Sequence, residues 1–203
     1  MSGTTLLARP SVEPASSVEA NAMPRVMLAG RERRRRIATH DLSAFRRPVI
    51  AGNRSLGWRM AWYAVNAVFF QGSLTGLLPS KLKAHILRLF GARVGTGLVV
   101  KPRVTIKYPW FLHVGDHVWI GEKAWIDNHC EVRLGSHVCI SQGAYLFTGN
   151  HDWNDRRFGF FCRPVRVGEG AWIGAFTIVP PGSDIPPGTV IACAPHANPK
   201  ATA

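Results

Sequence analysis

An aliphatic residue returns at every sixth position through most of the C-terminal half of this chain. An α-helix needs returns at three and four residues and an ordinary strand alternates every two, so a spacing of six fits neither element alone. A short strand followed by a corner does fit, and three such units close one coil of a triangular prism with the aliphatic residues on its axis. The series is Val94, Val100, Ile106 and Leu112; Val114, Ile120, Ile126 and Val132; Leu134, Ile140 and Leu146; and Val167, Ile173, Val179, Ile185 and Ile191.

A second column of small residues lies four positions after many of the aliphatic residues, as at Ala124, Ala144 and Ala171. A small side chain fits beside a large one on the axis of a narrow prism. Stacked coils pair strand on strand, and no coil buries its core alone. We therefore expect an all-β domain, a parallel β-helix of hexapeptide repeats, over residues 93–195. Glycines that directly follow the aliphatic residue predict corners with tight turns or positive φ, at positions 95, 115, 121, 135, 168 and 174.

Residues 41–92 precede the repeat and contain the most apolar part of the N-terminal half. We predict two helices there, roughly 57–71 and 79–90, and Gly91 stands where a helix C-cap would. The uninterrupted apolar pieces are far shorter than the ~20 residues that span a bilayer. We expect these helices to form a cap that covers one end of the prism.

Positive charge gathers at the front of the chain. The formal charge is +13, and residues 1–60 hold eleven Arg against four acidic residues. We expect residues 1–40 to form a disordered basic arm and 196–203 a tail. The run RERRRR at 31–36 is typical of a solvated tail but also attracts phosphates, on nucleic acid or on anionic lipids. No folded element or aromatic platform supports a nucleic-acid partner.

Aromatic residues of the expected cap helices suggest a second use for that region. They lie beside arginines, as side chains at a membrane interface do, so peripheral contact with an anionic membrane is the alternative to a purely covering role. These residues are Trp58, Trp62, Tyr63, Phe69 and Phe70.

Four cysteines occur without a CxxC pair, and residues 1–30 lack the continuous apolar segment of a secretory signal. Both features predict a reduced, cytoplasmic protein. The cysteines are Cys130, Cys139, Cys162 and Cys193.

The motifs VGDHVWIGEKAWID, VRLGSHVCISQGAYLFTGNHDW and VRVGEGAWIGA resemble those of hexapeptide-repeat acyltransferases. DLSAFRRP, LRLFGARVG and KPRVTIKYPW resemble more narrowly the colanic acid biosynthesis acetyltransferases, and the similarity covers roughly residues 41–195. The resemblance implies a left-handed β-helix and an acetyl-CoA-dependent O-acetyltransferase that acts on a sugar hydroxyl in exopolysaccharide biosynthesis. It also implies a homotrimer with the donor groove between subunits, and a sugar or lipid-linked saccharide as acceptor.

The repeat stops between Leu146 and Val167, and the polar segment 148–165 is expected to project as a catalytic loop. Transfer of an acetyl group to a hydroxyl needs a base that takes the hydroxyl proton, and histidine suits this role near neutral pH. His151 lies in this loop, and the resemblance assigns it that role, acting directly without an acyl-enzyme. For His113, His117, His129, His137 and His196 we expect no chemistry.

Polar residues near His151 are candidates for acceptor binding. Asp152 or a backbone carbonyl is expected to fix the tautomer of the histidine, Asn150 to shape the turn, and Trp153 to stack on a sugar ring or anchor the loop. Similar sugar acetyltransferases place acceptor-binding groups near Asp127 and Asn128, for which a corner turn is the alternative.

The resemblance places the donor acetyl-CoA along a prism edge at AWIGA, with Trp172, Gly174 and Ala175 as candidate contacts. The chain departs from the family pattern after Gly182, where about one coil is missing, and in its tail, where Lys200 is a poor substitute for the usual basic residue. An inactive scaffold or partner subunit with a shortened donor site is therefore an alternative.

A zinc hydratase of the γ-carbonic anhydrase type is a minor alternative, because enzymes of that class share the prism-shaped fold. The paired histidines that such a site needs are missing after His151. We therefore expect no metal.

Overall fold

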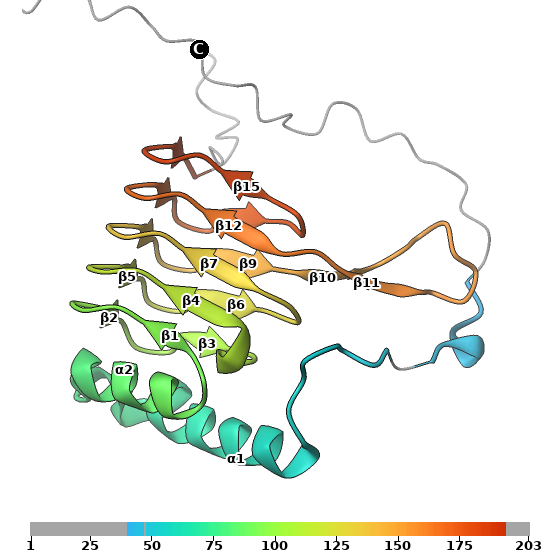
Figure 1. Ribbon diagram of the computed structural model, residues 1–203, viewed down its shortest axis with the longest axis horizontal. Helices are drawn as coiled ribbons and strands as arrows, with labels where there is room; N and C mark the ends of the chain where they lie inside the picture. The colour runs from blue at the N-terminus through green and yellow to red at the C-terminus, as the bar shows by residue number, and fades with distance from the viewer. Residues whose placement is uncertain (1–39, 47, 194–203) are drawn as a thin grey trace, which may run out of the picture. The chain divides into compact units, whose positions relative to one another are not determined.

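The computed structural model describes residues 40–46 and 48–193 of the chain. They form a parallel β-solenoid of about five coils, preceded by two helices at one end of the stack (Figure 1). This confirms the predicted β-helix architecture. The expected basic arm before residue 40, with RERRRR, and the tail 196–203, with Lys200, lie outside the described residues.

Three parallel sheets make the sides of the prism, and each chain segment moves from one sheet to the next at a corner. The first side, sheet A, holds β1 (Arg93–Val94), β4 (Leu112–Val114), β7 (Val132–Leu134), β12 (Val165–Val167) and β15 (Asp184–Ile185). The second side, sheet B, holds β2 (Val99–Val100), β5 (Trp119–Ile120), β8 (Cys139–Ile140), β13 (Trp172–Ile173) and β16 (Val190–Ile191). The third side, sheet C, holds β3 (Thr105–Ile106), β6 (Trp125–Asp127), β9 (Tyr145–Phe147) and β14 (Ile178–Val179).

The six-residue series fills the interior. Val94 and Ile191, at its two ends, are partly buried, and every position between them is buried. The strands stack in register, so that Ile120 lies opposite Ile140 and Ile140 opposite Ile173. Burial of one aliphatic side chain per strand therefore accounts for the period.

The glycines that directly follow the aliphatic residues do not have positive φ, which was one of the two reasons predicted for them. A Cβ atom at Gly121 would lie 2.5 Å from the backbone nitrogen of Gln142, so the close approach of the next coil excludes a side chain. Positive φ occurs two residues later, where Lys123 has a φ of 58°. Glycine after the aliphatic residue therefore permits stacking rather than a left-handed backbone.

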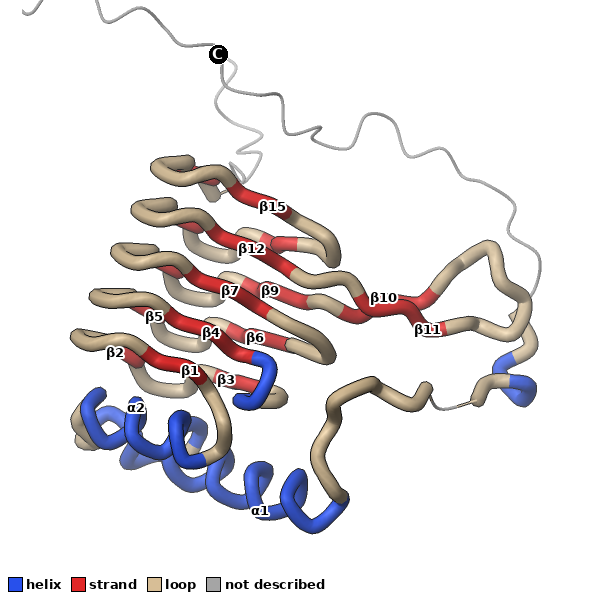
Figure 2. The backbone as a smooth tube through the Cα atoms, viewed as in Figure 1, coloured by secondary structure: helices blue, strands red, loops and turns tan. Residues whose placement is uncertain are grey.

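Two α-helices cover the N-terminal end of the stack, α1 (Leu56–Asn66) and α2 (Ser80–Leu89) (Figure 2). Trp62 of α1 is fully buried and donates its indole N–H to the carbonyl of Ile106 at 2.9 Å. Lys83 of α2 is also buried and donates to the carbonyl of Val100 at 3.1 Å. Both helices are thus tied to the solenoid. The short helical turns are η1 (Leu42–Ala44), the π-helical η2 (Ala67–Gln71), η3 (Ser73–Gly76) and η4 (Pro109–Phe111).

Within the described residues, none of the helices has both the length and the apolar character needed to cross a bilayer.

Candidate active site

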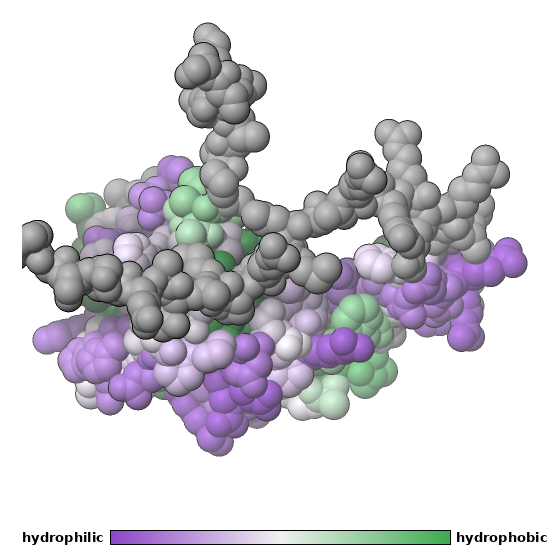
Figure 3. Space-filling model, turned by 90° about the horizontal axis from the view of Figure 1, so that it is seen from above, coloured by the Kyte–Doolittle hydropathy of each residue, from purple (hydrophilic) through white to green (hydrophobic). Residues whose placement is uncertain are grey.

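The segment that interrupts the repeat is a β-hairpin that leaves the side of the solenoid (Figure 1). Its strands are β10 (Gly149–His151) and β11 (Phe160–Cys162), paired antiparallel with His151 opposite Phe160. It links β9 of sheet C to β12 of sheet A, so it projects from the corner between these two sheets. The projecting end is mostly hydrophilic, at the right of Figure 3.

His151 is held on three sides. Its Nδ1 lies 2.8 Å from the carbonyl oxygen of Phe158, and its ring stacks on the Phe158 ring with centroids 3.9 Å apart. Phe45 and Phe160 meet the imidazole edge-on at 5.4 and 5.5 Å. Because a carbonyl only accepts, Nδ1 carries the proton in the neutral ring and Nε2 carries the lone pair. Of the two expected partners, the backbone carbonyl rather than Asp152 fixes the tautomer.

The polar residues of the hairpin tip shape its turns. The Asp152 carboxylate accepts from the backbone N–H of Asn154 at 2.9 Å, and the Asn150 amide oxygen accepts from the N–H of His151 at 2.8 Å. Asp155, which the sequence did not single out, accepts from the N–H groups of Arg157 and Gly159. These hydrogen bonds, led by that from Arg157, lower the pKa of Asp155.

Residues 40–46 form a strap across this tip, which the sequence did not indicate. The N–H of Asp41 donates to the carbonyl of Arg156 at 2.8 Å, and the His40 ring nitrogen Nε2 lies 2.8 Å from the carbonyl of Trp153. Phe45, at the end of the strap, brings its ring to His151. The Trp153 side chain stays 60% exposed, so it is free to contact an acceptor.

A charged cluster lies at the base of the hairpin. Asp127 pairs with Lys107 at 2.9 Å, accepts from the Tyr145 hydroxyl at 3.1 Å and lies 3.5 Å from Nε2 of His129. His129 also packs on Phe160, with centroids 5.0 Å apart, so the Phe160 ring contacts both His129 and His151. Burial, followed by the charge of Lys107, lowers the pKa of His129.

The place of His129 at the base of the hairpin was not predicted, and the expectation that it takes no part in the chemistry stays a prediction. No local pattern marked this place, because His129 lies in a bend after β6 and its partner Phe160 is distant in the sequence.

The structure corrects the expectation that Asn128 binds the acceptor. Asn128 is fully buried, and its amide exchanges two hydrogen bonds with the backbone of Tyr108, at 3.0 and 2.7 Å. A ligand cannot reach a side chain that is fully buried and has both polar atoms hydrogen-bonded inside the protein. Asn128 instead holds the segment that leads into η4.

Two thiols meet beside the buried hydroxyl of Thr148, where the hairpin leaves the solenoid. Cys162 lies 3.5 Å from the Thr148 hydroxyl, which also accepts from the backbone N–H of Cys130. The hydrogen bond between the two thiols lowers the pKa of Cys130 and raises that of Cys162.

The candidate donor residues lie on a different edge. Trp172 belongs to β13, and Gly174 and Ala175 follow it at the corner between sheets B and C. Trp172 is 52% exposed and donates its indole N–H to the Ser141 hydroxyl at 2.7 Å. One protomer therefore does not bring these residues to His151. Past Gly182 the solenoid continues without a break, since β15 pairs directly with β12.

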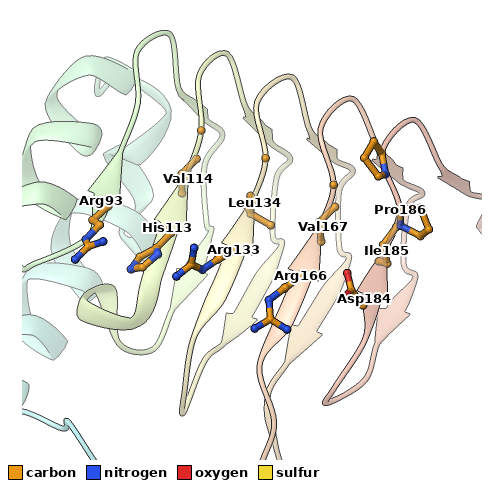
Figure 4. Close-up of a pocket in the computed structure, with 14 residues that line it drawn as sticks. Arg93, His113, Val114, Arg133, Leu134, Arg166, Val167, Asp184, Ile185 and Pro186 are labelled. Carbon is orange, nitrogen blue, oxygen red and sulfur yellow. The ribbon is translucent and has the colours of Figure 1, made fainter.

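A groove on the side wall of the solenoid is lined by none of the residues described around His151. It has a volume of about 470 Å³ and runs along sheet A, where outward residues of successive strands point to the same side (Figure 4). These residues are Arg93, His113, Arg133, Arg166 and Asp184. Because His151 is not among its lining residues, we assign the groove no part in acetyl transfer.

Among residues 40–46 and 48–193, no three His, Cys, Asp or Glu side chains are grouped so that they could hold a metal ion.

The curated proteins that this chain is similar to include an acetyltransferase of colanic acid biosynthesis and a nodulation protein. The chain is 38% identical over 152 residues to "Putative colanic acid biosynthesis acetyltransferase WcaF" of Escherichia coli (strain K12), across 74% of this chain and 82% of that protein. Nodulation protein L of Rhizobium leguminosarum bv. viciae is 32% identical over 100 residues, 48% of this chain and 52% of that protein. No family model matches the chain.

Solved structures share the solenoid. Galactoside acetyltransferase in complex with coenzyme A superimposes with a TM-score of 0.56 at 22% identity, over 68% of this chain and 78% of that chain. The hexapeptide-repeat containing acetyltransferase VCA0836 from Vibrio cholerae gives a TM-score of 0.55 at 19% identity, over 68% and 87%. At these identities the likeness concerns the fold.

Proposed function

Because this chain belongs to the family of hexapeptide-repeat acetyltransferases that includes WcaF, we propose that it transfers an acetyl group from acetyl-CoA to a sugar hydroxyl. The acceptor is a sugar or a lipid-linked saccharide in exopolysaccharide biosynthesis, by analogy with the colanic acid relative. The resemblance to hexapeptide-repeat acyltransferases supports a left-handed coil for the solenoid.

The observation that carries this proposal is the state of the His151 ring. The Phe158 carbonyl holds the proton on Nδ1, so Nε2 is the nitrogen that can accept a proton. In the proposed reaction Nε2 takes the proton of the acceptor hydroxyl while the hydroxyl oxygen attacks the carbonyl carbon of the thioester. The carbon–sulfur bond then breaks, and the proton passes from the imidazolium to the leaving thiolate of coenzyme A.

We assign acceptor binding to the residues that border His151 and retain accessible surface, and donor binding to the edge at β13. Asp127 is in reach through its partly exposed carboxylate, and Trp153 through its exposed ring. Asn150 and Asp152 contribute by shaping the hairpin. Trp172, Gly174 and Ala175 line the proposed donor edge.

A homotrimer would unite the two half-sites, because the hairpin of one protomer can reach the donor edge of the next. Apolar side chains support a protomer interface on sheets B and C, where outward residues such as Trp119 and Trp125 remain 43% and 46% exposed. The charged row of sheet A is suited to solvent instead. Rows of exposed aromatic residues are typical of surfaces that are buried in an assembly.

Residues 41–92 are assigned to a helical cap, 93–195 to the acyltransferase solenoid and 148–165 to its catalytic segment. A cytoplasmic location, with the acceptor at the inner face of the plasma membrane, belongs to the same proposal. The described cysteines are unpaired, which supports a reducing compartment.

Release of free thiol tests the activity. The purified full chain is incubated with acetyl-CoA and a panel of sugars, and His151→Ala is expected to lower the rate ~10²- to 10⁴-fold with an unchanged circular dichroism spectrum. Equal rates for the two proteins would remove His151 from the mechanism. A chain that binds no coenzyme A in calorimetry would instead be a scaffold, and one that holds stoichiometric zinc would support a hydratase.

A further inference from the structure

The face of α1 that points away from the solenoid carries no charged side chain. Trp62 and Asn66 point inward and are buried. The exposed large residues on the other side are Leu56 and Met60, at 65% and 56%, and Val68 of η2, at 64%. An exposed apolar helix face of this length marks a contact surface.

The neighbouring helix adds positive charge beside this face. Lys81, His85 and Arg88 are the exposed polar residues of α2, and Leu82 and Leu89 are exposed with them. Lys83 is excluded from this set because it is buried against the Val100 carbonyl. The exposed side of the helical cap therefore combines an apolar surface with cations.

No acidic residue occurs anywhere near this surface in the sequence. Between Asp41 and Asp116 the chain has eleven Lys and Arg residues and neither Asp nor Glu. Two copies of such a face would repel each other, so a second protomer is a poor occupant. A partner must offer negative charge and an apolar layer side by side.

A bilayer that contains anionic lipids offers both, since its head groups attract Lys and Arg and its acyl chains take up an apolar helix face. Trp58 and Tyr63 are each 39% exposed on α1, and such rings suit the boundary between the two layers. We propose that the exposed face of α1 and the basic residues of α2 dock this protein on an anionic lipid bilayer. The helix lies in the plane of the membrane, because it is too short to cross it.

Vesicle sedimentation tests the proposal with the full chain. Binding is expected to vesicles of phosphatidylcholine mixed with phosphatidylglycerol, at least roughly tenfold tighter than to phosphatidylcholine alone, and to weaken as salt is raised. The double variant Leu56→Gln/Met60→Gln is expected to lose roughly tenfold or more in affinity. Its matched control, Leu42→Gln, removes an exposed aliphatic residue that lies outside the cap helices and outside sheets B and C, and should bind like the wild type.

Charge is tested separately with Lys81→Gln, which removes an exposed cation of α2, against Arg166→Gln, which removes a cation from sheet A. The first is expected to weaken binding to anionic vesicles severalfold and the second to leave it unchanged. Equal binding to both kinds of vesicle, binding to neither, or equal losses in both charge variants would overturn the proposal. A shift of Leu56→Gln/Met60→Gln to a smaller oligomer without lipid would show that a second copy covers the face.

The outcome is independent of the proposed activity. Thiol release with a soluble acceptor is expected to be the same in Leu56→Gln/Met60→Gln and the wild type, since neither residue borders His151. Membrane binding without acetyl transfer would refute the proposed function alone, and acetyl transfer without membrane binding would refute the docking surface alone.

Discussion

The ring of His151 lies flat against that of Phe158, with 11° between the ring planes, and the same Phe158 supplies the carbonyl that meets Nδ1. Phe158 has a φ of 56°, in the left-handed region that a bulky side chain rarely adopts. Such a conformation persists only where the surroundings hold it, and the turn around Asp155 does so here. One residue thus orients the imidazole through both its backbone and its side chain.

Phe158→Ala separates these two contributions, because it removes the ring and keeps the carbonyl. Stacked aromatic pairs are worth about 0.5–1.5 kcal/mol, so we expect kcat to fall roughly three- to tenfold. Phe158→Tyr keeps the ring and should retain most of the rate. Steady-state kinetics with a fixed acceptor measures both, and a full rate in Phe158→Ala would show that stacking does not hold His151.

The strap is expected to act through Phe45. Phe45→Ala removes the edge contact with His151, and we predict a loss of roughly threefold in kcat/KM, together with faster hydrogen exchange of the hairpin amides. Leu42→Ala is the control, since Leu42 lies in the same segment and is 64% exposed. Similar losses in both variants would mean that the segment as a whole, rather than the Phe45 ring, supports the site.

Asn128 and Asp127 are neighbours with different roles. Asn128→Ala leaves the N–H and carbonyl of buried Tyr108 without partners, which costs about 2 kcal/mol or more of unfolding free energy, with acceptor KM unchanged. Asp127→Asn keeps the shape of a partly exposed side chain, so it should cost less than about 1 kcal/mol. It is expected to raise acceptor KM. Urea unfolding and steady-state kinetics on both variants test these expectations. If Asn128→Ala raised acceptor KM and Asp127→Asn did not, Asn128 would be the ligand.

His129 makes stability depend on pH. Its pKa in the folded protein lies below the ordinary value of about 6.5, because burial and Lys107 disfavour its charged form. Between the two values the unfolded chain binds a proton that the folded chain does not. The free energy of unfolding is therefore highest above about pH 6.5 and falls as the pH is lowered. Urea unfolding between about pH 7.5 and 5 is expected to show a shallower fall in His129→Gln.

His113 also has a lowered pKa, again led by burial, so part of the slope should remain in His129→Gln and disappear only when His113→Gln is added. An unchanged slope in the double variant would assign the pH dependence to other groups.

The repeat could be predicted from sequence because burial acts on each coil in the same way. Ile120, Ile140 and Ile173 occupy equivalent positions, so one rule places them all. The hairpin could be located because the rule fails there. The contact between Phe45 and His151 could not be predicted, since these two residues are far apart in the chain and belong to no repeat. Asn128 was misassigned because a buried amide and a ligand-binding amide look alike in sequence.

The separation of His151 from Ala175 leads to a test of the trimer. His151→Ala removes the base, and Ala175→Glu places a carboxylate at the edge proposed for the donor, so each variant alone is expected to be inactive. If the hairpin of one protomer serves the donor edge of the next, a trimer mixed by unfolding and refolding contains some intact sites. Equal mixing with random assembly makes about one site in four intact, hence about a quarter of wild-type thiol release. No recovery in mixed trimers, confirmed as mixed by mass spectrometry, would place base and donor in the same protomer and contradict the intersubunit site.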